Sequence, residues 1–168
     1  MMATFALMML LTLFMTASPV SSDTIQNLST EGNANPLCLS YGDSTTTEPQ
    51  DNMEVTTEIC DSKDPRQNSW FMLTVRVQSR DVKVVRFCVQ AKPKPLCYIQ
   101  EKKIRNYLGT VSSESDLKRL DFELLSDSSI SKPRTNDCIE AVAAGKGPRI
   151  ASCDDFGRNM AQKWRIQK

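Results

Sequence analysis

Short runs of alternating apolar and polar residues recur along the chain and predict β-strands. The run 70–77 alternates near its end, and 82–89 is β-branched and largely alternating. Residues 120–125 and 164–166 have the same character. Gly, Pro, Asp, Asn and Ser separate these runs, which is typical of an all-β domain with many turns. No stretch has sustained helical spacing, and 41–52 and 101–118 are expected to be long loops, the second with room for a helical turn.

The first 22 residues have the pattern of a signal peptide. An uncharged apolar run from Phe5 to Met15 is too short to span a bilayer as a helix, and small residues suited to cleavage follow it. A retained membrane anchor is the less favoured alternative. We therefore expect residues 1–22 to be removed and the protein to be secreted and extracellular, with no membrane span.

Residues 23–34 are polar and are expected to form a flexible lead-in. This segment contains the sequon Asn27-Leu28-Ser29. Because secretion exposes a chain to glycosylation, the sequence predicts a glycan on Asn27.

The cysteines show a period of fifty residues. Cys38, Cys88 and Cys138 each open a similar phrase, and each is followed by one further cysteine. A fixed period suggests three copies of one supersecondary unit. Six cysteines can pair in many ways, but an oxidising compartment lets them pair and the repeat favours one pairing within each unit. The expected disulfides are Cys38–Cys60, Cys88–Cys97 and Cys138–Cys153.

Two units share a second pattern, a Cys-Asp turn followed ten or eleven residues later by Trp. It appears as Cys60-Asp61 before Trp70 and as Cys153-Asp154 before Trp164, where the close is Gln162-Lys163-Trp164. Phe122 stands where the second unit should have its Trp. The three rings are expected to be core residues, since each is large and flanked by strand residues.

These motifs resemble the repeats of the ricin B-type lectin family, which includes the cysteine-rich domain of mannose receptors. The resemblance implies that residues 35–168 form a β-trefoil, in which three four-stranded units surround a pseudo-threefold axis and share one core. It also implies a shallow sugar pocket in each competent unit. In that family an acid two residues after the first Cys, an aromatic ring and an Asn before Gln-x-Trp contact the sugar.

Only the third unit retains much of this site. The resemblance assigns carbohydrate binding to Glu140, Phe156, Asn159 and Gln162, although Glu140 is longer than the usual Asp and Ala161 replaces the usual Asn. The glutamine is also expected to bond the backbone at a turn, and an exposed strand carboxylate is the alternative for Glu140. Ser40 and Gln90 occupy the acid position of the other units, so those pockets are expected to be lost.

Charge is unevenly distributed and offers a second binding mode. Residues 23–75 carry nine acids and two bases, whereas residues 76–120 carry eleven bases and four acids. A basic face could attract a sulfated or acidic glycan, while ordinary solvated strand faces are the more common explanation. The residues assigned to polyanion binding are Lys92, Lys94, Lys102, Lys103 and Arg105.

A short stretch also resembles secreted fibroblast growth factor-binding proteins, which are heparin-binding carriers. It comprises Cys88-Val89, Cys97 and Arg105-x-Tyr107. The resemblance supports a heparin-binding or protein-binding alternative, such as a growth-factor carrier. Nucleic acid is disfavoured because the net charge of the whole chain is only +1.

The chain has no histidine, which removes the usual general base and the usual metal ligand. The cysteines lack the C-x-x-C spacing of zinc sites. We therefore expect no enzyme, no metal and no cofactor. The sequence predicts a secreted lectin-like protein, with a heparin- or protein-binding trefoil that has lost its sugar pockets as the alternative.

Overall fold

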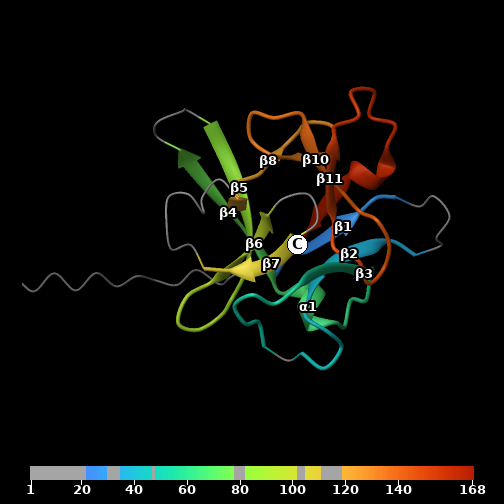
Figure 1. The fold of residues 1–168 in the computed structure, drawn as a ribbon. Coiled ribbons are helices and arrows are strands. Elements are labelled where there is room, and N and C mark those ends of the chain that lie inside the picture. The colour runs from blue at the N-terminus through green and yellow to red at the C-terminus, as the bar shows by residue number, and fades with distance from the viewer. Residues whose placement is uncertain (1–21, 30–34, 47, 78–81, 102–104, 111–118) are drawn as a thin grey trace, which may run out of the picture.

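A computed structural model describes residues 22–29, 35–46, 48–77, 82–101, 105–110 and 119–168. Its strands form three sheets of four strands each, and the described residues also include the short helices α1 (Pro65–Asn68) and η1 (Met160–Gln162) (Figure 1). The chain is thus all-β, as the alternating pattern predicts. The expected signal peptide, except Ser22, lies outside the described residues.

Each sheet is antiparallel and is built from consecutive strands, except that the last strand of the chain joins the first sheet. The first has the order β12-β1-β2-β3, with strands Trp164–Gln167, Thr24–Asn27, Leu37–Tyr41 and Val55–Ile59. The second has the order β4-β5-β6-β7, with strands Trp70–Val77, Val82–Val89, Leu96–Glu101 and Arg105–Gly109. The third has the order β11-β10-β9-β8, with strands Arg149–Ser152, Asp137–Glu140, Ile130–Ser131 and Glu123–Leu124.

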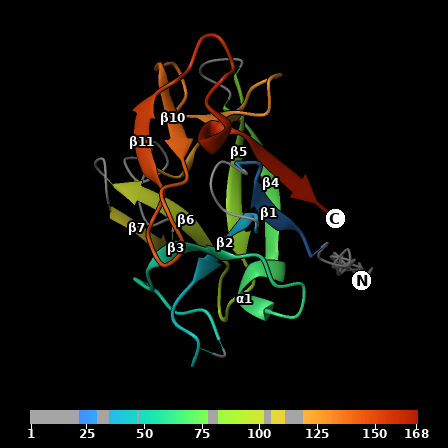
Figure 2. The ribbon, with the colours of Figure 1, turned by 90° about the vertical axis from the view of Figure 1, so that its right-hand side faces the viewer.

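Six of these strands form a closed ring. Ladders join β12 to β1, β4 to β5 and β8 to β9. Single bridges at Asp23–Trp70, Val85–Phe122 and Ser129–Lys163 close the gaps between the ladders. The remaining strands form the pairs β2–β3, β6–β7 and β10–β11, which lie to the left of the ring strands β1, β4 and β5 in Figure 2. The same arrangement therefore occurs three times.

The predicted aromatic core is confirmed. Trp70, Phe122 and Trp164 are all buried. The indole nitrogens of Trp70 and Trp164 donate to the carbonyls of Leu39 (3.1 Å) and Ile139 (3.0 Å), which lie at matching places in β2 and β10. Phe122 has no such donor and instead stacks on Tyr98, with ring centroids 5.3 Å apart. Burial of rings of this size removes about 150–250 Å² each from water.

All three predicted disulfides are present, but they are not equivalent. Cys38, Cys97 and Cys138 are each the second residue of their strand, in β2, β6 and β10. Cys88 lies instead in β5, facing Cys97 across the ladder. The fifty-residue period therefore does not mark equivalent positions, because the second unit carries its extra cysteine one strand early rather than after its third strand.

Two loop predictions are wrong. The expected lead-in 23–34 contains β1, which lies between β12 and β2 and buries Ile25. Four residues with one aliphatic side chain are too short a run for a pattern to reveal. The expected loop 101–118 contains β7, which completes the ladder with β6.

Asn27 is a structural residue of the ring. Its side chain is 0% exposed, and its amide nitrogen donates to the carbonyls of Ala161 (2.8 Å) and Lys163 (2.9 Å). Its amide oxygen accepts from the backbone of Ser29 at 3.0 Å. The amide nitrogen of Asn27 cannot carry a glycan and also make both of these hydrogen bonds. We therefore expect the folded chain to be unmodified at Asn27, contrary to the prediction from the sequon.

Two variants separate the structural role of the Asn27 amide from its place in a glycosylation sequon. Asn27→Ala removes all three side-chain hydrogen bonds of this buried residue and is expected to lower the free energy of unfolding by about 2–3 kcal/mol. Ser29→Ala also destroys the sequon but keeps the amide, so it should change stability by less than about 0.5 kcal/mol. Denaturant unfolding measures both values. A mass loss of the folded wild-type protein on treatment with an N-glycosidase would contradict the assignment.

Candidate functional site

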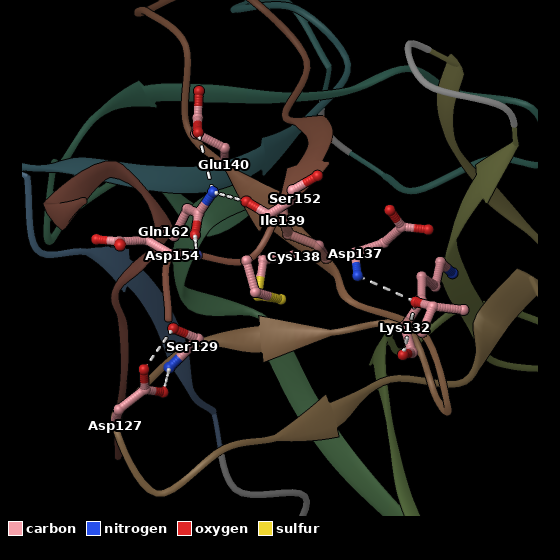
Figure 3. Close-up of a disulfide and its surroundings, with 12 residues drawn as sticks. Asp127, Ser129, Lys132, Asp137, Cys138, Ile139, Glu140, Ser152, Asp154 and Gln162 are labelled. Carbon is pink, nitrogen blue, oxygen red and sulfur yellow. Dashed lines mark hydrogen bonds between the residues drawn. A yellow bond between two sulfur atoms is a disulfide. The ribbon is translucent and has the colours of Figure 1, made fainter. Parts of the chain in front are cut away.

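Two glutamine side chains stabilise the turns that follow β3 and β11 by hydrogen bonds to the backbone. The side chain of Gln162 accepts from the backbone of Asp154 (2.9 Å) and donates to the carbonyl of Ser152 (2.9 Å), as Figure 3 shows. Gln67 makes the same two bonds, to Asp61 (2.8 Å) and Ile59 (3.0 Å). The expected backbone role of the glutamine is confirmed. Sequence inspection missed Gln67 because it stands three residues before its Trp rather than two.

The structure brings three of the predicted sugar-site residues together at Glu140, the last residue of β10. One carboxylate oxygen accepts from the side chains of Asn159 (2.8 Å) and Gln162 (3.1 Å). The other accepts from Arg149, with its Nε at 2.8 Å and its Nη2 closer still. Glu140 is only 6% exposed, so it is not the exposed strand carboxylate of the alternative interpretation.

Arg149 is the residue of this cluster that the sequence did not reveal. It faces Glu140 across the β10–β11 ladder, and its side chain is 57% exposed. Finding it requires the register of that strand pair, for which the sequence gives no turn of recognisable type. An ionised carboxylate has about four acceptor positions. All of those on Glu140 are therefore occupied by neighbouring side chains.

The hydrogen bonds set the ionisation of Glu140. Burial raises its pKa, but hydrogen bonds from Arg149, Gln162 and Asn159 together outweigh burial, so the pKa lies below the ordinary value of 4.5. The carboxylate is thus held in its charged form. Its charge serves to orient the three donors around it.

Asp154 shapes the loop beside this cluster. Its carboxylate accepts the backbone N–H groups of Asn159, Phe156 and Arg158, which lower its pKa. The loop that it braces carries Phe156, whose side chain is 80% exposed. The Arg158 guanidinium lies 5.2 Å from the centre of that ring. The predicted aromatic is therefore exposed, in the loop that also contains Asn159.

The other two units lack the carboxylate. Ser40 occupies in β2 the place of Glu140 in β10, and it is buried with its hydroxyl unpaired among the described residues. In the second unit that place belongs to the buried Ile99, since Cys97 is the second residue of β6 as Cys38 is of β2 and Cys138 of β10. Gln90, which the fifty-residue period assigned there, is an exposed residue after β5. The third unit alone retains an acid at this position.

The predicted basic residues are spread over the second sheet. Lys92 and Lys94 are exposed in the β5–β6 connection. Arg105 begins β7, where it pairs with Glu101 at 3.3 Å and lies over the ring of Tyr107. The length of β6, about 20 Å, separates Arg105 from the two lysines. Lys102 and Lys103 lie outside the described residues.

In the part of the chain that the structure describes, no three His, Cys, Asp or Glu side chains gather as metal ligands. Nor does any helix there have the length and hydrophobicity to cross a membrane. No protein-family model matches the chain, and no curated protein matches it significantly.

The Glu140 cluster makes stability depend on pH. The folded pKa lies below the unfolded value, so the stabilisation is complete above about pH 5 and is lost as pH falls through the folded pKa. Glu140→Gln is expected to lower the free energy of unfolding at pH 7 by about 1–3 kcal/mol. It should also flatten part of the acid limb of stability against pH, measured by denaturant unfolding.

Asp155→Asn is the matched control for this change. Asp155 is exposed in the adjacent loop, and its side chain forms no hydrogen bond or ion pair with another described residue. The control should follow the wild-type curve. An acid limb that Glu140→Gln leaves as steep as in the wild type would refute the role of this carboxylate.

Proposed function

We propose that this chain is a secreted, non-enzymatic protein with the β-trefoil fold of ricin B-type lectins, and that its third unit binds a glycan. The repeated sheet arrangement and the closed ring of six strands support the fold. The disulfides and the pattern of residues 1–22 support secretion.

One observation carries the glycan proposal. Asn159 and Gln162 converge on Glu140, and the exposed ring of Phe156 stands in the same short loop as Asn159. An aromatic face beside directional polar groups suits recognition of a sugar. Because Glu140 has no acceptor position left, it acts as a positioning residue. The sugar contacts then fall on Phe156, Asn159 and the exposed side chain of Arg149.

Removing the ring tests this site. Phe156→Ala is expected to reduce affinity for any glycan identified on an array by about tenfold or more, since stacking on an exposed face is lost. Stability should change by less than about 0.5 kcal/mol because the ring is exposed. Isothermal titration measures the affinity.

Leu124→Ala is the matched control, an exposed apolar residue in β8 of the same sheet. It should leave glycan affinity unchanged. A glycan array without any specific ligand, or equal affinity in Phe156→Ala and wild type, would overturn the assignment.

A second candidate is binding of a sulfated polysaccharide or an extracellular protein through the basic residues. The observation that favours it is that Lys92 and Lys94 are exposed and have no carboxylate partner among the described residues. If the ligand is a sulfated polysaccharide, the protein must be retained on heparin resin above physiological salt concentration. That retention must disappear in a Lys92→Gln, Lys94→Gln double variant.

A further inference from the structure

A groove with a volume of about 600 Å³ lies between the β2–β3 and β5–β6 connections, which are the cyan and lime loops at the bottom of Figure 1. We propose that this groove binds an extended polypeptide segment of a partner protein that carries both acidic and basic side chains. This site is separate from the proposed glycan site. The groove residues are Glu48, Pro49, Gln50, Asp51, Gln90, Ala91, Lys92, Pro93, Lys94, Leu96 and Thr110.

The β5–β6 wall is built to hold its lysines in place. Cys88 and Cys97 face each other across the ladder, so their disulfide ties the two ends of the connection together. The connection reads Ala91-Lys92-Pro93-Lys94-Pro95, and each proline fixes its own φ and restricts the residue before it. A restrained loop loses little conformational entropy when it binds a ligand. The other two disulfides join residues 22 and 15 apart and lie at the far ends of the β2–β3 and β10–β11 pairs from the connections that they enclose.

The charges of the groove point to a ligand of mixed charge. Lys92 and Lys94 lie on one connection, and Glu48 and Asp51 lie on the other. Neither lysine nor Glu48 forms an ion pair with another described residue. Asp51 accepts only weak bonds from the backbone of Thr110 (3.3 Å) and the side chain of Asn52 (3.2 Å). A polyanion that reached the lysines would meet like charges on the opposite wall.

The other lining residues favour a polypeptide over a sugar. Among the described residues that line the groove there is no aromatic ring on which a pyranose face could stack. Gln50 and Gln90 are exposed and can each donate to and accept from a peptide backbone. Pro49, Pro93 and the buried Leu96 supply apolar surface for the stems of side chains. The volume lies within the range of about 300–1,000 Å³ for binding pockets.

The test uses a labelled octapeptide of alternating Glu and Lys, with blocked ends, and fluorescence anisotropy at low ionic strength. We expect saturable binding to the wild-type protein. Lys92→Glu with Lys94→Glu should weaken this binding by about tenfold, since two attractive contacts become repulsive. Lys63→Glu with Lys146→Glu is the control, because it makes the same change in charge at exposed lysines outside the groove. The control should stay within about twofold of wild type, since those side chains do not touch the ligand.

Three outcomes would overturn the proposal. The first is no saturable binding of the alternating peptide to the wild-type protein. The second is an equal effect of both double variants, which shows attraction to net charge alone. The third is tighter binding of an all-Glu octapeptide or a heparin fragment, which shows a polyanion site. Phe156→Ala should bind the peptide normally, so failure of the glycan site and failure of this groove are distinguishable.

Discussion

Closure of the six-stranded ring is the constraint on which the rest of this structure depends. Strands β8 and β9 have two residues each, and strands of that length have no stability of their own. The bridges at Asp23–Trp70, Val85–Phe122 and Ser129–Lys163 convert three separate ladders into one continuous surface. Each bridge pairs backbone N–H and C=O groups at or next to a core aromatic residue. Without the bridge these buried groups would be left unpaired, which costs free energy. The rings of Trp70, Phe122 and Trp164 fill the interior that this closure creates.

The Glu140 cluster illustrates how residues predicted from the sequence to bind a sugar serve the fold. Its donors come from β11, from the loop after it and from η1, so the carboxylate joins three segments of the third unit. Gln162 then connects this cluster to the turn after β11, and Asn27 connects η1 to the first strand. The carboxylate of Glu140 is thus saturated by its donors, and its role in the structure is to orient them.

Sequence reasoning succeeded where the pattern was local. Alternation located β4, β5 and β12, and the pairing of each cysteine with its successor was right. It failed where the answer depends on which strands meet. Asn27 looked like an exposed sequon because its partners, Ala161 and Lys163, lie at the other end of the chain. Arg149 was missed for the same reason, since only the register of β10 and β11 brings it to Glu140.

The position of the second disulfide has a consequence for how this fold can diversify. Cys88–Cys97 encloses a separation of 9 residues, against 22 and 15 for the other two. In the chain-entropy account the shortest enclosed segment gives the smallest gain in overall stability. Its main effect is to fix the anchor points of residues 90–95. A peptide of different sequence or length could be grafted between those anchor points while the surrounding six-stranded ring keeps its geometry. Residues 90–95 are therefore a segment whose replacement can give the fold a new binding specificity.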